Sequence, residues 1–314
     1  MIVAVTGLST SSNPEAGFGV LKSLKNVTHR DFRLVGLAYQ PMETGLFHPG
    51  LMDRAFIVPA PRIDREAFIG RVGQIKNETG LDIIIPNIDD EIEAFASMAD
   101  ELGAMGVATL LPGRPALREM QSAINRQRTT QDFSAEEDDN HDAMVLPSTL
   151  VKNPVSERIS PENKISDFYA LAVLASRKSK VIALSAVKKI LISSYGGTWM
   201  ALTVDAGEFA ALAENLVKDA SWQGPLTIEV TRSRRGEQYI SGARPVFPDW
   251  INLARAAGAN LPAMLVDVIR GRVVKGVVQA APGKVLIRSS LDVVTDLNNF
   301  GKISLNGGID YARN

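Results

Sequence analysis

The chain has 314 residues, of which 45% are hydrophobic and 22% are charged, and its formal net charge is −1 at pH 7. This composition is typical of a soluble globular protein that is long enough for two domains or for one large α/β domain. A net charge so close to zero argues against nucleic acid as a partner.

The residue types that are rare in the sequence narrow the chemistry further. Cysteine is absent, which excludes disulfides and thiolate zinc sites. The three histidines, His29, His48 and His141, are far apart, which disfavours a histidine metal site or a Ser-His-Asp triad. No stretch reaches the ~18 apolar residues of a membrane span, and the first residues lack the basic region of a secretion signal. We therefore expect a cytoplasmic protein with no membrane partner.

Residues 1–128 alternate short apolar runs with amphipathic segments. Continuous apolar runs suit strands that are buried on both faces of a parallel sheet, and the segments between them predict helices. The expected strands are 2–6, 33–38, 55–58, 81–86 and 107–111, and the expected helices are 16–24, 64–78, 89–102 and 114–128. This alternation predicts a parallel, doubly wound sheet.

A loop rich in Ser, Thr and Gly begins at Gly7, directly after the first expected strand. Backbone N–H groups at such a strand-to-helix junction can bind a phosphate. The loop contains neither G-x-x-x-x-G-K-[ST] nor a complete G-x-G-x-x-G. A phosphate-binding loop and a plain turn both remain open here.

The segment 129–142 (TTQDFSAEEDDNHD) is polar, acidic and without periodicity, and residues 152–164 are also polar. This composition indicates a surface linker. His141 with its neighbouring aspartates is an alternative metal site, although a solvated acidic loop is the favoured interpretation. We expect residues 129–164 to separate an N-terminal domain from a C-terminal domain of residues 165–314.

The next expected strands are 165–175, 181–192 and 198–204, followed by helices at 206–220 and 249–271, the latter interrupted by Gly258 and Pro262. Lys188 and Lys189 lie in the second of these strands. Because side chains alternate across a strand, one of the two lysines must point away from any site that holds the other. An exposed lysine that protects a sheet edge is the alternative to a functional role.

Residues 224–250 (GPLTIEVTRSRRGEQYISGARPVFPDW) predict two strands joined by an Arg-rich turn. Leu226, Ile228 and Val230 alternate with polar residues, which is the period of a strand. Glu229 lies in the middle of the first strand, and Arg244 lies just beyond the second. Glu229 is either an outward-facing residue of a half-exposed sheet or a ligand for a metal or phosphate above the sheet.

This stretch resembles the C-terminal core of the ATP-grasp superfamily of ATP-dependent carboxylate–amine and carboxylate–thiol ligases. The family pattern W-x-G-P-x-x-hydrophobic-E is matched by Trp222, Gly224, Pro225 and Glu229. The following pattern, hydrophobic-E-hydrophobic-N-x-R-F-P-x-W, is matched in its second half by Arg244, Phe247, Pro248 and Trp250. Small residues, Ser241 to Ala243, stand where the family has its second acid and its asparagine.

The N-terminal part is similar to the domain that precedes the ATP-grasp core. The matching segments occur in the family's order: Asp53–Pro59, Asp82–Pro86 with Asp89 and Glu91, and Leu111-Pro112. The resemblance implies a Rossmann-like pre-ATP-grasp domain with a parallel sheet (1–128) and a truncated ATP-grasp α+β core with an antiparallel sheet (165–314). The linker 129–164 stands where most of the family's lid is expected.

The resemblance also implies cofactors and site residues. ATP and magnesium are the implied cofactors, with Gly7 and Glu229 at the nucleotide and Glu229 as a magnesium ligand. Lys188, Lys189 and Arg244 are the implied catalytic cations. The smaller number of acids implies less magnesium binding than in the family.

Two functions follow from these observations. The first is a binding module that keeps the scaffold and has lost full ligase activity, with a peptide, a small carboxylate or a catalytic protein as its partner. The second is an active ligase that works through an acylphosphate with a shortened lid. The tail 273–314 contains short apolar segments, VVKGVVQ, KVLIR and KISLNGG, which we interpret as strands that cover an open sheet edge or form a homodimer contact.

Overall fold

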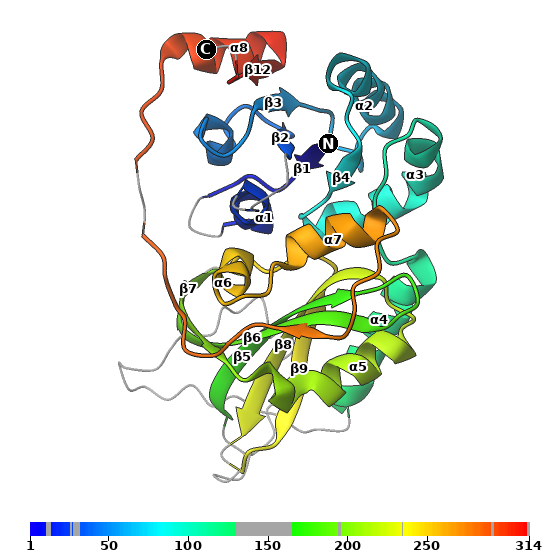
Figure 1. Ribbon diagram of the computed structural model, residues 1–314, viewed down its shortest axis with the longest axis vertical. Coiled ribbons are helices and arrows are strands. Elements are labelled where there is room, and N and C mark those ends of the chain that lie inside the picture. Colours follow the sequence, from blue (N-terminus) through cyan, green and yellow to red (C-terminus); the bar gives the residue numbers. More distant parts are fainter. Residues whose placement is uncertain are drawn as a thin grey trace.

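The computed structural model describes residues 1–10, 14–25, 27, 32–129, 165–193, 196–233, 235–289 and 292–312. Two sheets lie one above the other along the long axis of the molecule (Figure 1). Three helices pack between them: α1 (Ala16–Lys25), α6 (Ile251–Ala256) and α7 (Leu261–Ile269). Almost all of the expected linker, residues 130–164, lies outside the described residues.

Sheet A has the strand order β12-β3-β2-β1-β4. Its parallel strands are β1 (Ile2–Val5), β2 (Arg33–Ala38), β3 (Arg54–Ile57) and β4 (Ile83–Ile85). Helix α1 covers one face, and α2 (Arg65–Thr79) and α3 (Ile92–Ala104) cover the other. Burial on both faces explains why the strands are continuous apolar runs, and the predicted parallel, doubly wound sheet is confirmed.

The expected strand 107–111 is wrong, because this segment makes only an isolated bridge between Ala108 and Ile83. Beyond that bridge the chain turns toward the other sheet. A Cβ on Gly224, at the start of the first strand of the 224–250 stretch, would lie only 2.6 Å from the carbonyl oxygen of Leu110. The segment therefore leaves sheet A after one bridge and reaches α4 (Arg114–Thr129), which packs on the other sheet.

The turn from β1 into α1 brings the start of the helix very close to the end of the strand. Gly7 has a φ of 72°, a left-handed conformation that favours glycine. A Cβ on Gly17 would lie 1.9 Å from the carbonyl oxygen of Thr6. The first turn of α1 therefore rests directly on the backbone at the carboxyl end of β1.

Sheet B has the strand order β11-β7-β6-β5-β8-β9, all antiparallel, and β10 pairs in parallel with the start of β6. The strands are β5 (Ile165–Ala175), β6 (Val181–Ile192), β7 (Thr198–Val204), β8 (Gly224–Ser233), β9 (Gln238–Arg244), β10 (Val278–Gln279) and β11 (Val285–Ile287). The predicted antiparallel sheet is therefore confirmed.

The two faces of sheet B differ in their packing. Leu171 and Ile228 face α4, the 3-10 turn η4 (Ala206–Phe209) and α5 (Ala210–Asp219). Ala170 and Ala172 point to the opposite face, toward α6 and α7. Small side chains on this second face let the helices between the sheets approach closely.

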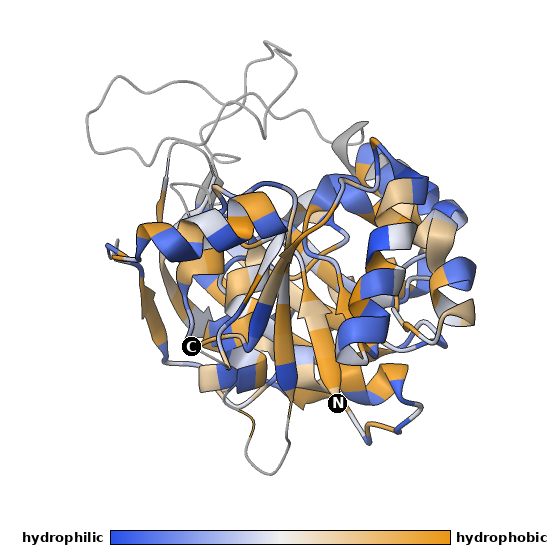
Figure 2. Cartoon of the chain, turned by 90° about the horizontal axis from the view of Figure 1, so that it is seen from above, coloured by the Kyte–Doolittle hydropathy of each residue, from blue (hydrophilic) through white to orange (hydrophobic). Residues whose placement is uncertain are grey.

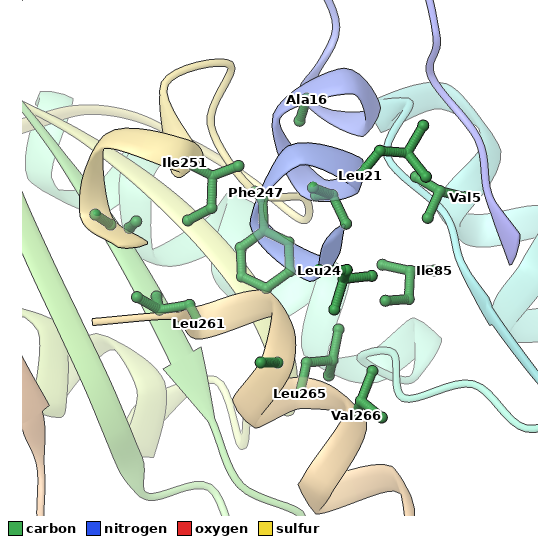
Figure 3. Packing of buried hydrophobic residues seen from close by; sticks show 14 of the residues in the cluster. Val5, Ala16, Leu21, Leu24, Ile85, Phe247, Ile251, Leu261, Leu265 and Val266 are labelled. Carbon is green, nitrogen blue, oxygen red and sulfur yellow. The ribbon is translucent and has the colours of Figure 1, made fainter. Parts of the chain in front are cut away.

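The core between the sheets joins α1 to α6 and α7, which lie more than 220 residues later in the sequence. Leu21 and Leu24 of α1 meet Phe247, Ile251 of α6 and Leu265 of α7 (Figure 3). All five side chains are buried. Seen from above, the central strands are mostly hydrophobic and the surrounding helices carry hydrophilic outer faces (Figure 2). Fully burying each such side chain stabilises the folded chain by about 1.5–3 kcal/mol, so this core fixes the two sheets against each other.

The tail returns to sheet A. Residues 302–308 were expected to form a strand, and this is wrong, because α8 (Leu297–Asn306) occupies most of the segment. Phe300 and Ile303, three residues apart, lie on one side of that helix, where the ring of Phe300 stacks on Phe47. After α8, β12 (Gly308–Asp310) pairs antiparallel with β3. The expectation that the tail covers an open edge is confirmed for β12.

Two further expectations concern the division into domains and the absence of a membrane span. Residues 297–312 pack on the N-terminal sheet, although the expected division grouped them with the C-terminal core. Among the described residues, no helix is both long and apolar enough to cross a membrane.

Replacing Gly17 by Ala is expected to destabilise the chain by about 3 kcal/mol, because the added methyl group has no room beside the backbone of Thr6. Gly103→Ala in α3 is the matched control, since a Cβ there has no atom within 4 Å. This control should stabilise the chain by up to about 1 kcal/mol. Urea unfolding of the three proteins measures both effects, and equal stability of the two variants would contradict the packing described.

Candidate functional site

Three of the expected site residues share one face of sheet B. Glu229 of β8 lies opposite Ala170 of β5 and Gly242 of β9. Arg244 follows Gly242 by two residues and therefore points to the same side. Lys189 of β6 reaches Glu229 on that side. The face is the one that looks toward α6, α7 and sheet A.

Glu229 and Lys189 form a buried ion pair. The Lys189 Nζ lies 2.6 Å from the Glu229 Oε2, and the two side chains are 6% and 12% exposed. Removing a charge from water costs several kcal/mol unless a partner compensates for it, so each residue makes the burial of the other possible. The strand alternation placed Glu229 on an outward face, and the helices between the sheets then cover it.

Lys188 lies on the opposite face. It pairs across the ladder with Tyr169, which belongs to the core under α5, and its ammonium group forms an ion pair with Asp167. The structure therefore does not bring Lys188 together with Glu229 and Arg244. Alternation decides which of the two adjacent lysines belongs to the site.

Arg244 is the half-exposed cation of the site. Its Nη1 lies 3.9 Å from the Oδ2 of Asp89, a long ion pair that crosses from sheet B to the end of sheet A. Among the described residues, the guanidinium group makes no hydrogen bond. Burial opposes its charge, but the carboxylates of Asp89, Glu229 and Asp249 outweigh that effect and raise the pKa of Arg244. Three acids thus converge on one guanidinium group.

Asp249 and Arg288 complete the charged cluster, and the sequence did not reveal either of them. Asp249 accepts a hydrogen bond from the backbone N–H of Thr198 at 2.8 Å, and its Oδ2 lies 3.1 Å from the Nη2 of Arg288. Asp249 was visible only as part of the FPDW segment. Arg288 carried no signal, because its place depends on the pairing of β11 with β7.

Asp89 belongs to η2 (Asp89–Glu91), the turn that follows β4. Burial raises the pKa of Asp89, although the positive charge of Arg244 opposes the rise. In the sequence, Asp89 is part of a family pattern but has no predicted role at the site. In the structure it connects the two sheets electrostatically.

Glu91, two residues later, is a buried hydrogen-bond acceptor inside sheet A. The hydroxyl groups of Thr6 and Tyr39 donate to its two carboxyl oxygens. The backbone N–H groups of Asn87 and Ile88 donate to Oε1 at 2.9 and 3.1 Å. Burial raises the pKa of Glu91 to about 7, although these donors oppose the rise. Glu91 therefore joins the ends of β1, β2 and β4.

Gly7 lies at the same end of sheet A. A Cβ there would be 3.1 Å from the carbonyl oxygen of Asn87, so the tight turn alone accounts for glycine at this position. Residues 11–13 of the following loop lie outside the described residues. The phosphate-binding role of Gly7 stays a prediction.

The residues around Glu229 do not suit a magnesium ion. One oxygen of Glu229 is already bound to the ammonium group of Lys189. The position opposite it on β9 is Gly242, which offers no side-chain oxygen. Magnesium requires several oxygen ligands in octahedral geometry. Across the described part of the chain, no group of three or more His, Cys, Asp or Glu side chains is arranged to hold a metal.

Comparison with solved structures finds similar folds at low sequence identity. Biotin carboxylase from Campylobacter jejuni has a TM-score of 0.56 and 9% identity, over 88% of this chain and 72% of that one. N5-carboxyaminoimidazole synthetase from Staphylococcus aureus, complexed with ADP, has a TM-score of 0.56 and 12% identity, over 90% and 81%. Pyruvate carboxylase from Rhizobium etli has a TM-score of 0.55 and 13% identity, and the chain spans only 26% of it. No protein-family model matches the sequence, and no similar sequence is found among curated proteins.

A pH-dependent stability is expected from Glu91. Its pKa rises from 4.5 in the unfolded chain to about 7 in the folded chain. Its contribution to folding is therefore complete below pH 4.5 and is lost as the pH rises through 7, by up to about 3 kcal/mol. Glu91→Gln cannot ionise and should lack this fall. Urea unfolding between pH 4 and 8 measures the difference, with the exposed Asp90→Asn as control. If the difference in unfolding free energy between the wild type and Glu91→Gln were the same at every pH, the raised pKa of Glu91 would be excluded.

Proposed function

The chain has the ATP-grasp fold, and from this premise we propose that it is a binding module for a carboxylate, with an incomplete ligase site. The observation that carries the proposal is the Lys189–Glu229 ion pair, with an Nζ–Oε2 distance of 2.6 Å. In this module the carboxylate that would hold a metal is neutralised by the chain's own lysine.

Arg244 is the proposed contact for the ligand. Its side chain is 42% exposed, and its guanidinium group has a long ion pair as its main interaction. A guanidinium group has five N–H donors in a planar arrangement that matches the two oxygens of a carboxylate. A ligand carboxylate could replace the long contact to Asp89 with two short, charge-assisted hydrogen bonds. The ligand is a small carboxylate or a peptide, and it binds on the sheet B face next to Asp89.

One comparison supports an anionic ligand for a protein of this fold. The biotin carboxylase domain of 2-oxoglutarate carboxylase from Hydrogenobacter thermophilus, which has a TM-score of 0.56 and 12% identity, was crystallised as a dimer with MgADP, ADP and bicarbonate. Bicarbonate has the same planar pair of oxygens as a carboxylate. By analogy with that dimer, the proposal also includes a protein partner, which is either a second copy of this chain or a catalytic protein.

The second candidate function is an active ATP-dependent carboxylate–amine or carboxylate–thiol ligase. The observation that favours it is that two proteins of the same fold were crystallised with ADP. A ligase needs cations at the transferring phosphoryl group and a place for MgATP. Lys189 and Arg244 would have to supply those cations, and Lys189 would first have to leave Glu229.

Nucleotide titration separates the two functions. The binding module is expected to give no heat with MgATP up to millimolar concentration and no ADP release on addition of carboxylates and amines. A short peptide with a free C-terminus should bind at least tenfold more tightly than its amidated form, and Arg244→Gln should abolish this preference. Magnesium-dependent ADP release would favour the ligase, and loss of that activity in Glu229→Gln would establish it.

Substitution of the adjacent lysines tests the buried ion pair. Lys189→Met leaves the carboxylate of Glu229 buried without its partner and should destabilise the chain by about 3–5 kcal/mol. Lys188→Met is the matched control. Its side chain is 41% exposed, so loss of its ion pair with Asp167 should cost less than about 1 kcal/mol.

The double variant Lys189→Met, Glu229→Leu removes both charges and should recover most of the stability, because a hydrophobic pair can replace a buried ion pair. Urea unfolding measures all four proteins. Equal losses in the two single lysine variants would contradict the burial of the Lys189–Glu229 pair.

A further inference from the structure

A surface cavity of about 600 Å³, wide open to solvent, lies between α2 and the carboxyl ends of β2 and β3. Tyr39, directly after β2, lines one side together with Val58 and Pro59, directly after β3. Ligands of parallel α/β sheets bind outside the carboxyl ends of the strands, and pockets for small molecules have volumes of about 300–1,000 Å³. The cavity therefore has the place and the size of a small-molecule site, and it is separate from the face that holds Glu229.

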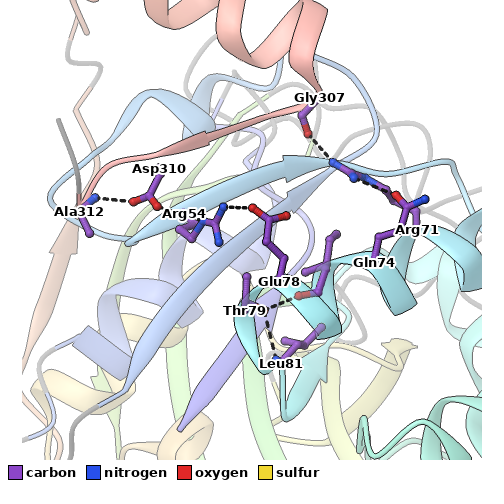
Figure 4. A network of polar contacts seen from close by, with 10 residues as sticks. Arg54, Arg71, Gln74, Glu78, Thr79, Leu81, Gly307, Asp310 and Ala312 are labelled. Carbon is purple, nitrogen blue, oxygen red and sulfur yellow. Dashed lines mark hydrogen bonds and ion pairs between the residues drawn. The ribbon is translucent and has the colours of Figure 1, made fainter.

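The strand side of the cavity is mainly apolar, and the helix side supplies the polar groups, Arg71 and Gln74 of α2. Arg71 donates three hydrogen bonds, all to uncharged oxygens: from Nε to the carbonyl of Ile57 at 3.3 Å, from Nη1 to the Oε1 of Gln74 at 3.1 Å, and from Nη2 to the carbonyl of Gly307 at 3.0 Å. Figure 4 shows two of these contacts, to Gln74 and to Gly307. They hold the guanidinium group in a fixed orientation at the edge of the cavity.

The charge of Arg71 has no carboxylate partner among the described residues. Three of the five N–H groups of a guanidinium are used in its hydrogen bonds, which leaves one on Nη1 and one on Nη2. The amide nitrogen of Gln74 adds further donors beside them. A site with one positive charge and only donors at its polar end selects a ligand with a single negative charge and two acceptors.

Gly70 opens the helix side of the cavity. It lies in the middle of α2, where glycine costs up to about 1 kcal/mol relative to alanine. A Cβ at this position has no atom within 4 Å, so the space beside it is open. A larger side chain at position 70 would therefore enter the cavity without displacing the core.

We propose that this cavity binds a small monocarboxylic acid with an apolar body. The carboxylate accepts hydrogen bonds from the free N–H groups of Arg71, and the apolar body packs against Tyr39, Val58 and Pro59. The C-terminal segment takes part in this site, because the carbonyl of Gly307 orients Arg71. The inference does not depend on the function proposed for the Glu229 face.

Calorimetric titration with 4-methylpentanoate and 3-phenylpropanoate, each compared with its uncharged amide, tests the proposal. The acids should bind with dissociation constants in the micromolar to millimolar range, and the amides at least tenfold more weakly. Arg71→Gln should weaken binding of the acids at least tenfold. Arg62→Gln, which removes an exposed arginine paired with Asp90, is the matched control and should bind like the wild type.

Gly70→Leu is a second test of the cavity, which is needed if Arg71→Gln disturbs the packing of the C-terminal segment on sheet A. The leucine should occupy the part of the cavity beside Arg71 and abolish binding of both acids, while the circular dichroism spectrum stays unchanged. Three results would overturn the proposal. They are binding of neither acid by the wild type even at about 10 mM, equally strong binding of acid and amide, and binding that persists in both Arg71→Gln and Gly70→Leu. Loss of binding in Arg244→Gln alone would instead assign the acids to the sheet B face.

Discussion

The ion pair between Lys189 and Glu229 determines what the inner face of sheet B can do. Both charges lie under the helices between the sheets, so neither can lose its partner without a large cost in folding free energy. The pair therefore removes one carboxylate and one ammonium group from the chemistry available to a ligand. Arg244 remains as the half-exposed charge, held near Asp89 by a long contact. Recognition of an anion requires only this group, whereas phosphoryl transfer requires several more.

The short turn η2 connects this face with sheet A. Asp89 at its start interacts with Arg244 on sheet B, and Glu91 at its end accepts hydrogen bonds from Thr6 and Tyr39 in sheet A. Tyr39 also lines the cavity beside α2. The two ends of one short turn thus contact Arg244 on sheet B and a residue that lines the cavity.

Much of the fold could be predicted from the sequence, because period-two alternation and continuous apolar runs report local structure directly. The same alternation placed Glu229 on the polar side of its strand, although it did not predict that this side is buried, and it gave the rule that only one of Lys188 and Lys189 can belong to the site. Asp249 and Arg288 could not be found this way, since their contact joins a loop to an edge strand 39 residues later. Residues 302–308 were read as a strand because a short apolar segment does not distinguish a strand from a helix turn that buries one side. The 107–111 segment differs from the prediction because the chain makes one bridge to β4 and then turns, so that the carbonyl of Leu110 lies beside Gly224 of β8.

Strand β12 has a consequence for how the chain is made. Arg71 and Gly307 meet across 236 residues of sequence. At ribosomal rates of about 5–20 residues per second, the N-terminal sheet waits on the order of 10–50 seconds for the strand that closes its edge. During synthesis the edge of β3 is bare, and an unpaired strand edge is a template for misassembly with neighbouring nascent chains. The N-terminal sheet thus depends for its protection on a segment that is translated 236 residues after Arg71.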